Sequence, residues 1–354
     1  MMGDRFSQLV AAEDLAATRE LLERDPDLAH RLRSVALEKA GALSGLYHHN
    51  VRVGNLMCRF PAAGADNLDR RTYEENDVLR AIQPHLGRKA SHLVYEGQGW
   101  SVHAYEEGRV LHELSPPGRP VPRLVLDDTV DLFRRLTDVP LGDMGLPPWW
   151  PEDGDSVGFG LRRAIQASVA HWKSTRWFGR EFDLLGLPLQ PHRAMVGRLT
   201  KLTPRPFQLL HNDLHRGNII VRPDGHAVFV DWELATIGDW VYEVATHLHL
   251  MRYTEGDRQY LLERCLERMP PASTEGWQAD LETYLDLNRV QSAVNDTVRV
   301  ILKIRKERLS PAEKGEMVLA LTGTLNTAGR IWGMEKVLSP DEVAAAVQAG
   351  VVGE

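Results

Sequence analysis

The sequence of 354 residues predicts an α+β fold with two lobes, a small strand-rich lobe over residues 1–106 and a larger, mostly helical lobe over residues 107–354. Three observations lead to this prediction. Short runs rich in β-branched and aromatic residues gather before residue 106, and helical spacing of apolar residues dominates after it. The polar stretch Glu106-Glu107-Gly108 lies between them and is typical of a hinge.

The first lobe is expected to begin with a helical extension over residues 1–40. Leucines recur there at roughly helical spacing, and Asp25-Pro26 indicates a break. Two short strands are expected within 41–60, with Gly54-Asn55 at the turn between them. The other elements expected in this lobe are a helix over 67–84 and strands over 92–95 and 100–105.

The second lobe is expected to be a set of helices with one hairpin. Two short β-branched runs, 217–221 and 227–230, flank the strong turn signal Arg222-Pro223-Asp224-Gly225. Apolar spacing predicts helices over 127–137, 159–175, 191–203, 239–252, 257–268, 275–307, 311–332 and 340–348.

Composition excludes several classes of protein. The net charge of −7 argues against a protein that binds nucleic acid through a basic surface. Acids at positions 4, 13 and 14 interrupt any apolar run near the N-terminus, and no run of 18 apolar residues is present, so neither a signal peptide nor a membrane span is expected. The two cysteines, Cys58 and Cys265, fit a reducing compartment, and a cytoplasmic location is expected.

One stretch carries the polar residues that suggest chemistry. Asp213 lies in a loop, Asn218 opens the first strand of the hairpin, and Asp231 follows its second strand. Because hairpin pairing brings the start of one strand beside the end of the other, these two carboxylates and one amide are expected to converge. Hard oxygen ligands of this kind suit Mg²⁺, which takes its other ligands from phosphates and water.

The order His-x-Asp-x-x-x-x-Asn, then a hairpin, then Asp is that of protein-kinase-like phosphoryl-transfer enzymes. The run His211-Asn212-Asp213-Leu214-His215-Arg216-Gly217-Asn218 resembles the signature loop of the aminoglycoside phosphotransferase and choline kinase family, and Asp231-Trp232-Glu233 fits the same family. The resemblance is specific over about 205–250 and looser over 41–110. It implies a bilobal protein-kinase-like fold and transfer of the γ-phosphate of Mg–ATP, or of GTP, to a small-molecule hydroxyl.

The resemblance also implies roles for individual residues. Asp213 would be the catalytic base, and His211 would brace its loop. Asn218 and Asp231 would hold Mg²⁺ on the nucleotide phosphates. Glu233 would either reach a second metal ion through water or serve as a structural ion pair.

The nucleotide site is expected in the first lobe. No Gly-x-x-x-x-Gly-Lys-Ser/Thr loop is present, so a P-loop enzyme is excluded. Protein kinases place a lysine on their third strand, but the single lysine between residues 40 and 100, Lys89, falls outside the expected strands. Arg59 stands at the matching place, where it would clamp phosphate oxygens. Its partner would be Glu75, or Glu74 one residue earlier.

Two other parts of the first lobe are expected to meet the nucleotide. The segment 41–52, which includes Ser44, would form a hairpin over the phosphates. Adenine would lie against residues 102–105, with backbone groups from His103 to Tyr105 making its hydrogen bonds.

Two features argue against a protein as the acceptor. Asn212 replaces the arginine that receives an activation-loop phosphate in regulated protein kinases, and seven residues between Asp231 and Asp239 are too few for an extended activation segment. Asp239 itself is expected to cap the next helix. A small molecule is therefore expected, most simply an aminoglycoside, a nucleoside or a related antibiotic, in resistance or self-protection. The candidate pocket residues, besides Asp213, are Glu243, Glu255, Asn295 and Asp296.

Two other functions stay open at this stage. One is a metabolic kinase for choline, ethanolamine or a sugar, and the other is a pseudokinase that binds nucleotide without turnover. The acids between residues 127 and 160, together with Trp149, would either attract a cationic acceptor or form a solvated face. No feature of the sequence fixes the oligomeric state.

Overall fold

The computed structural model describes residues 2–39, 43–44, 48–61 and 71–349. The chain forms two compact units, each drawn from several stretches of sequence. Unit 1 comprises Met1–Pro147, Gln208–Ile237 and Leu250–Pro270, and unit 2 comprises Pro148–Phe207, Gly238–His249 and Pro271–Glu354. The lobe boundary expected at residue 106 does not coincide with this division and stays a prediction.

Unit 1 begins with three helices, α1 (Met2–Ala11), α2 (Leu15–Arg24) and α3 (Pro26–Glu38). The break predicted at Asp25-Pro26 is confirmed. The Asp25 carboxylate accepts a hydrogen bond from the backbone N–H of Leu28, and Pro26 occupies the first helical position, where its missing N–H costs nothing. Asp14 caps α2 in the same way.

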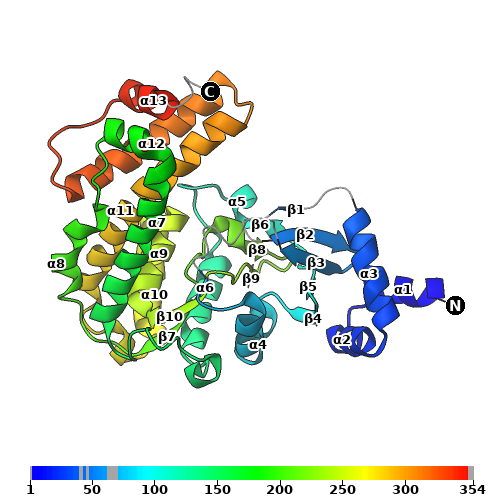
Figure 1. The fold of residues 1–354 in the computed structure, drawn as a ribbon. Coiled ribbons are helices and arrows are strands. Elements are labelled where there is room, and N and C mark those ends of the chain that lie inside the picture. Colours follow the sequence, from blue (N-terminus) through cyan, green and yellow to red (C-terminus); the bar gives the residue numbers. More distant parts are fainter. Residues whose placement is uncertain (1, 40–42, 45–47, 62–70, 350–354) are drawn as a thin grey trace. The chain divides into compact units, whose positions relative to one another are not determined.

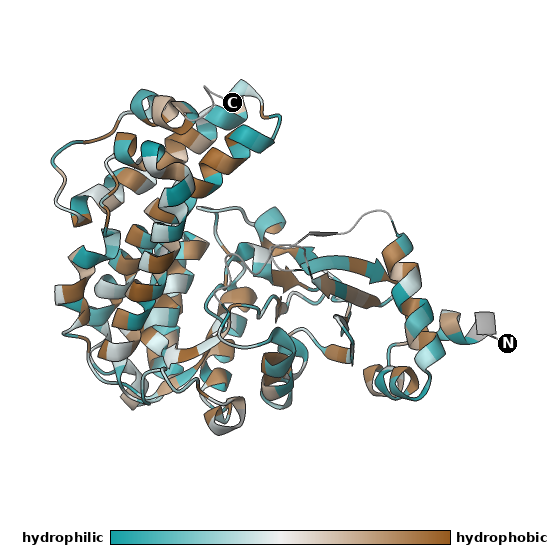
Figure 2. Ribbon diagram, viewed as in Figure 1, coloured by the Kyte–Doolittle hydropathy of each residue, from teal (hydrophilic) through white to brown (hydrophobic). Residues whose placement is uncertain are grey.

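A five-stranded antiparallel sheet follows in the order β1-β2-β3-β5-β4 (Figure 1). Its strands are β1 (Leu43–Ser44), β2 (His48–Val53), β3 (Leu56–Pro61), β4 (Leu93–Gly97) and β5 (Trp100–Ala104). The turn predicted at Gly54-Asn55 joins β2 to β3, and Gly54 adopts a φ of 65°, which glycine tolerates best. Strand β3 is mostly hydrophobic, whereas β2 is more polar (Figure 2). Cys58 and Val102 of the central strands are fully buried with leucines of the N-terminal helices.

The helix expected over 67–84 is shorter at its start, because α4 spans Glu75–Leu86. Residues 67–70 of that prediction lie outside the described residues, and so do Gly41 and Gly45 of the expected phosphate hairpin. The further elements of unit 1 before residue 147 are η2 (Gly87–Lys89), β6 (Arg109–Val110), α5 (Leu111–Leu114), α6 (Arg123–Leu136) and η3 (Leu141–Met144).

The predicted hairpin is present as β8 (Ile219–Val221) and β9 (Ala227–Phe229), and β6 pairs with β8 on its other side. The first strand starts later than expected, because Arg216–Asn218 form a 3₁₀ turn, η5. The His215 Nδ1 atom holds this turn by accepting the backbone N–H of Gly217 at 2.9 Å. Beside the hairpin along the chain are β7 (Phe207–Leu210), β10 (Thr236–Asp239) and α10 (Glu255–Arg268).

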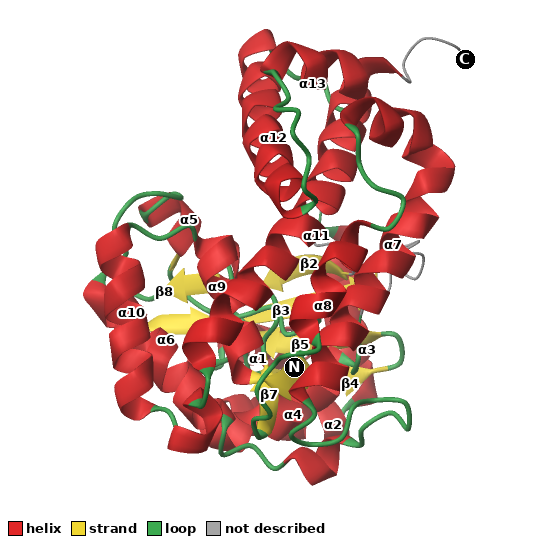
Figure 3. Ribbon diagram, turned by 90° about the vertical axis from the view of Figure 1, so that its left-hand side faces the viewer, coloured by secondary structure: helices red, strands yellow, loops and turns green. Residues whose placement is uncertain are grey.

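Unit 2 is built from helices (Figure 3). They are α7 (Ser156–Leu185), η4 (Pro191–Met195), α8 (Val196–Leu199), α9 (Trp240–Met251), η6 (Pro271–Thr274), α11 (Trp277–Lys306), α12 (Pro311–Ile331) and α13 (Pro340–Gln348). Buried side chains of α7, α11, α12 and α13 form its core, including Phe182, Ile301 and Leu321. The α+β class predicted from the sequence is confirmed.

Two helix predictions in unit 2 were wrong in extent. Helix α7 is longer than 159–175, because Asp155 caps its start and Gly186, with a φ of 71°, ends it. The helix expected over 191–203 is only the 3₁₀ turn η4 followed by the short α8. Gly197 lies within α8 and has low helix propensity, which fits the short helical pieces. Within the described part of the chain, no helix combines the length and apolarity needed to cross a bilayer.

Candidate active site

The loop between β7 and η5 is held by a buried histidine. His211 is fully buried, and its Nε2–H donates to the backbone carbonyl of Val230 at 3.1 Å. Its ring also lies against Trp232, with 4.5 Å between the ring centroids. Burial lowers the pKa of His211 to about 4, so the ring is neutral near pH 7. These contacts fit a bracing role, because they tie the loop to the residue before Asp231.

The structure brings Asp213, Asn218 and Asp231 together within unit 1. The Asn218 side-chain Nδ2 donates to the backbone carbonyl of Asp213 at 2.9 Å, and the backbone N–H of Val230 donates to the Asn218 carbonyl at 3.0 Å. Asn218 is therefore fixed to the loop on one side and to the end of the hairpin on the other. The Asp213 carboxylate is also close enough to raise the pKa of Asp231.

Asp231 carries the features of a cation ligand. Its φ is 68°, a left-handed conformation that Asp adopts more readily than most residues. Its Oδ1 atom is buried and, within the described residues, has no hydrogen-bond partner. Burial, with Glu233 and Glu75 nearby, raises its pKa to about 7. A buried carboxylate oxygen without a hydrogen bond and the Asn218 amide offer the hard oxygen donors that Mg²⁺ prefers, so these residues fit the ion.

Arg59 of β3 is buried among acids. Its Nη1 atom lies 2.6 Å from Glu75 Oε2, and its Nη2 atom lies 2.7 Å from Glu233 Oε1 and 3.8 Å from Asp231 Oδ1. The other oxygen of Glu75 accepts the backbone N–H of Trp232 at 3.0 Å. Burial alone would raise the pKa of Glu75, but Arg59 outweighs it and holds this pKa below its ordinary value.

The partner left open in the sequence is therefore Glu75, the first residue of α4. Glu74 instead lies 3.6 Å from Arg71. Lys89 is in η2, as expected outside the strands, and forms ion pairs with Asp128 and Asp131.

Sequence reasoning missed His48, the first residue of β2. Its Nδ1 atom lies 2.5 Å from Glu233 Oε1. Ligand atoms of His48, Glu75 and Glu233 lie within 4.8 Å of one another, a spacing that suits a metal ion. Arg59 already donates to both carboxylates, so its guanidinium provides the positive charge in this cluster. This geometry favours the structural ion pair for Glu233, and its metal role stays a prediction.

Two of the residues expected to meet the nucleotide, Ser44 and His103, lie on different strands of the five-stranded sheet. Ser44 lies in β1 opposite His49, and its side chain is outside the described part of the structure. His103 is buried on β5, where burial and Arg59 lower its pKa to about 3. Its Nε2 atom lies 3.0 Å from the Ser101 hydroxyl.

Two backbone N–H groups in the expected adenine region already have partners. Ala104 donates to the carbonyl of His92, and Tyr105 donates to the carbonyl of Asn55, each at 2.9 Å. The Tyr105 ring carries the Arg52 guanidinium, 3.5 Å from its centroid. The adenine contact therefore stays a prediction, and it needs backbone groups other than these two N–H groups.

Besides Asp213, the residues expected at the acceptor divide between the two units, and their role stays a prediction. Glu255 is exposed at the start of α10 in unit 1, and the other three belong to unit 2. Glu243 is buried on α9. Asn295 and Asp296 are partly buried on α11, and Asp296 accepts a hydrogen bond from Arg299 at 3.0 Å.

The expected aromatic contact at Trp149 is already made within the protein. The Arg162 guanidinium lies 3.9 Å from the centroid of the Trp149 ring. One face of this ring therefore already holds a cation, which weakens the reading of Trp149 as a site for a cationic acceptor.

Asp239 immediately precedes the helix α9, as expected of a cap. Its Oδ1 atom accepts the backbone N–H of Val241 at 2.9 Å. The sequence did not indicate its second partner, Arg205, which is fully buried and donates to both oxygens of Asp239. Arg205 also donates to Asp280 at 2.6 Å. No local signal identifies this cluster, because its members come from distant parts of the sequence.

Most of the chain matches a known protein family. The model of the phosphotransferase enzyme family matches residues 40–268. No protein of curated function matches the chain in sequence. Among solved structures, the choline kinase LicA from Streptococcus pneumoniae is 14% identical over 85% of this chain and 98% of its own, with a TM-score of 0.54.

Two further structures share the fold. An ethanolamine kinase from Plasmodium vivax is 12% identical over 90% of this chain and 96% of its own, with a TM-score of 0.57. A ternary complex of streptomycin, ATP and APH(2")-IIa is 13% identical over 87% of this chain and 98% of that chain, with a TM-score of 0.52. These likenesses confirm the kinase-like fold. The family match covers well over half of the sequence, and the chain therefore belongs to the phosphotransferase enzyme family, as a small-molecule kinase.

Proposed function

We propose that the protein is an ATP-dependent O-phosphotransferase that transfers the γ-phosphoryl group to a hydroxyl of a small molecule. The observation that carries this proposal is the meeting of Asp213, Asn218 and Asp231 at one end of the hairpin. The Oδ1 atom of Asp231 adds to it, because a buried carboxylate oxygen that accepts no hydrogen bond from the described residues suits a cation bound to phosphates.

The mechanism assigns a task to each of these residues. Asp213, which is half-buried at the loop, orients the acceptor hydroxyl and takes its proton as the oxygen attacks the γ-phosphorus. Asn218 and Asp231 would hold Mg²⁺, which neutralises charge on the phosphates when bound. The new P–O bond forms as the bond between the γ-phosphorus and the bridging oxygen breaks, and ADP leaves. No covalent intermediate with the enzyme is needed, because both reactants are held in line.

Arg59 would guide the phosphates from the neighbouring strand. Its guanidinium reaches Asp231 Oδ1 at 3.8 Å while it holds Glu75 and Glu233. A guanidinium held this rigidly presents its remaining N–H groups in a fixed direction, which favours a single phosphate geometry. GTP stays an alternative to ATP, since the base contacts expected in this region are made by the backbone.

The acceptor we propose is an aminoglycoside, a nucleoside or a related antibiotic. Structures with the same fold include an aminoglycoside phosphotransferase bound to streptomycin and ATP, which supports this class. Choline and ethanolamine kinases share the fold equally well and support the metabolic alternative. The cytoplasmic location expected from the composition stays a prediction.

The test is ATP consumption by the purified chain across a panel of aminoglycosides, nucleosides, choline, ethanolamine and sugars. With the active acceptor, Asp213→Ala should lower turnover about 100- to 10,000-fold while ATP affinity changes little. Asp224→Asn, in the exposed hairpin turn, is the matched control and should behave as the wild type. Near-wild-type turnover in Asp213→Ala would show that the base is assigned wrongly. Tight Mg–ATP binding without turnover for any acceptor would favour the pseudokinase.

A further inference from the structure

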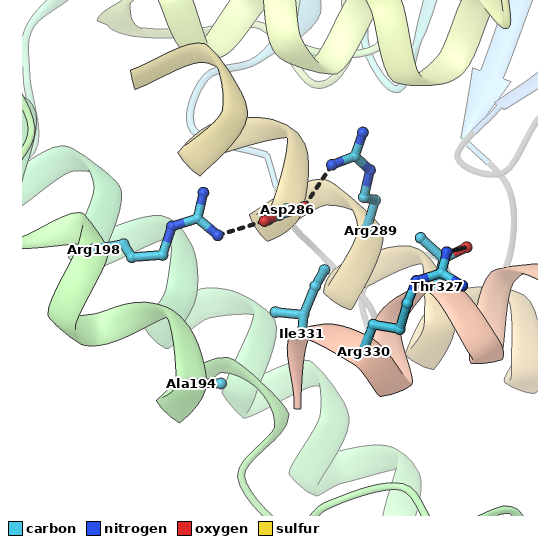
Figure 4. Close-up of a pocket in the computed structure, with 7 residues that line it drawn as sticks. All are labelled: Ala194, Arg198, Asp286, Arg289, Thr327, Arg330 and Ile331. Atoms are coloured by element: carbon cyan, nitrogen blue, oxygen red, sulfur yellow. Dashed lines mark hydrogen bonds and ion pairs between the residues drawn. The ribbon is translucent and has the colours of Figure 1, made fainter. Parts of the chain in front are cut away.

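A pocket of about 590 Å³ lies in unit 2 among α8, α11 and α12 (Figure 4). None of its lining residues is among those assigned to phosphoryl transfer, which belong to unit 1. Its volume is in the range of small-molecule sites. The pocket is lined by Ala194, Arg198, Asp286, Arg289, Thr327, Arg330 and Ile331.

The pocket has an excess of positive charge. Three arginines and one aspartate line it, which leaves a formal charge of about +2. Asp286 is shared by two of the arginines, because its Oδ1 lies 2.5 Å from Arg289 and its Oδ2 accepts a hydrogen bond from Arg198 (Figure 4). Arg289 also lies 3.3 Å from Glu282. These contacts orient two of the three guanidinium groups.

Arg330, in the last turn of α12, differs from the other two. Over the described ranges, no carboxylate lies within 4.0 Å of its guanidinium, and its hydrogen bond is to the neutral Thr327 hydroxyl at 3.4 Å. An arginine that lines a pocket and has no acidic partner can donate charge-assisted hydrogen bonds to a bound anion. The cluster therefore has an oriented pair of guanidiniums and a third, exposed guanidinium that has no acidic partner among the described residues.

We propose that this pocket binds a phosphate dianion, either free or as the monoester of a small molecule. Guanidinium groups match the oxygens of phosphate with paired N–H donors, and a phosphate monoester carries up to two negative charges near pH 7, which complements the excess of arginines in the lining. Ala194 and Ile331 supply an apolar part of the wall for the carbon skeleton of an ester. This inference does not depend on the acceptor proposed above.

The test is isothermal titration of the full chain, without nucleotide or Mg²⁺, with inorganic phosphate and with glycerol 3-phosphate. The wild type should bind at least one of them, and Arg330→Gln should weaken that binding about tenfold or more. Arg176→Gln, at an exposed arginine of α7 in the same unit, is the matched control and should bind like the wild type. Tighter binding of glycerol 3-phosphate would identify an ester as the ligand, and equal binding would identify free phosphate.

Four results would overturn the proposal. One is no binding of either compound at millimolar concentration, and another is unchanged binding in Arg330→Gln. The third is equal binding of succinate, a dianion without phosphorus. Arg330→Lys keeps the charge if Arg330→Gln folds poorly, and it should bind more weakly than the wild type, because lysine cannot donate in a paired fork. Unchanged binding in this variant would also overturn the assignment.

Discussion

Replacing Arg59 by methionine tests the buried ion cluster of unit 1. The Arg59 side chain is 9% exposed, Glu75 is 5% exposed and Glu233 is 7% exposed, so solvent screens these charges little. Removing one partner of a buried pair leaves the other charge uncompensated and costs about 3–5 kcal/mol. We expect a loss of this size in the free energy of unfolding at pH 8.

The dependence of this loss on pH follows from the pKa of Glu75. In the wild type this pKa is lowered by Arg59, so the stability that Glu75 contributes is present above its unfolded pKa and is lost as the pH falls through its folded pKa. Without Arg59, burial raises the pKa of Glu75, and protonation relieves the buried charge. The difference between Arg59→Met and the wild type should therefore be largest near pH 8 and smaller at pH 5.

Urea unfolding followed by circular dichroism at both pH values measures this difference. Arg59→Met/Glu75→Gln is the matched double variant, and it should recover part of the loss because it removes one of the carboxylates left without a partner. A loss below about 1 kcal/mol at pH 8 would refute the reasoning. A loss that is equal at pH 5 and pH 8 would refute the electrostatic cause.

Three further predictions concern other positions. Asp231→Asn should weaken Mg–ATP binding and stabilise the free protein by ~1 kcal/mol at pH 8, and by less at pH 5. The folded pKa of Asp231 is raised to about 7, so its carboxyl destabilises the fold mainly when it is ionised, and its partial exposure keeps this cost small. Thermal denaturation with and without Mg–ATP measures both effects, and a less stable variant at pH 8 would contradict the prediction. Arg205→Met should lower the free energy of unfolding, measured with urea, by about 3–5 kcal/mol, because the substitution leaves Asp239 buried without its cation. Near-wild-type stability would argue against this prediction. Gly54→Ala should lower the free energy of unfolding by about 1–3 kcal/mol and expose α1 to earlier proteolysis. The added Cβ would meet the Val10 carbonyl oxygen at 2.0 Å, and the φ of 65° is strained for alanine. An unchanged cleavage rate would show that α1 adapts.

The part of the site that could be predicted from the sequence depends on short-range rules. Asn218 and Asp231 flank one hairpin, and the pairing of two strands joined by a tight turn fixes which ends meet. Arg59 and Glu75 lie on a strand and on the helix that follows it along the chain, so their pairing also needed few assumptions. Resemblance to a known loop then supplied the chemistry that these positions carry.

The remaining contacts could not be predicted, because they join residues far apart in the sequence. His48 and Glu233 are separated by 185 positions, and Arg205 and Asp280 by 75. A single sequence shows that such residues are polar, but it does not show which of them share a buried space. The predicted helix ends were wrong for a different reason. In α7, the cap at Asp155 and the left-handed Gly186 set ends that lie beyond the clear apolar pattern.

The charges around Arg59 explain why one carboxylate of the cluster is left for a cation. Arg59 faces three acids but lies closest to Glu75 and Glu233, at 2.6 and 2.7 Å, whereas Asp231 is 3.8 Å away. The pKa of Glu75 is accordingly lowered and that of Asp231 is raised to about 7, although both belong to one cluster. The excess negative charge is therefore concentrated on Asp231, where ionisation is costly until a cation binds. Since binding and ionisation favour each other, the stabilisation of the protein by Mg–ATP should grow as the pH rises from 6 to 8.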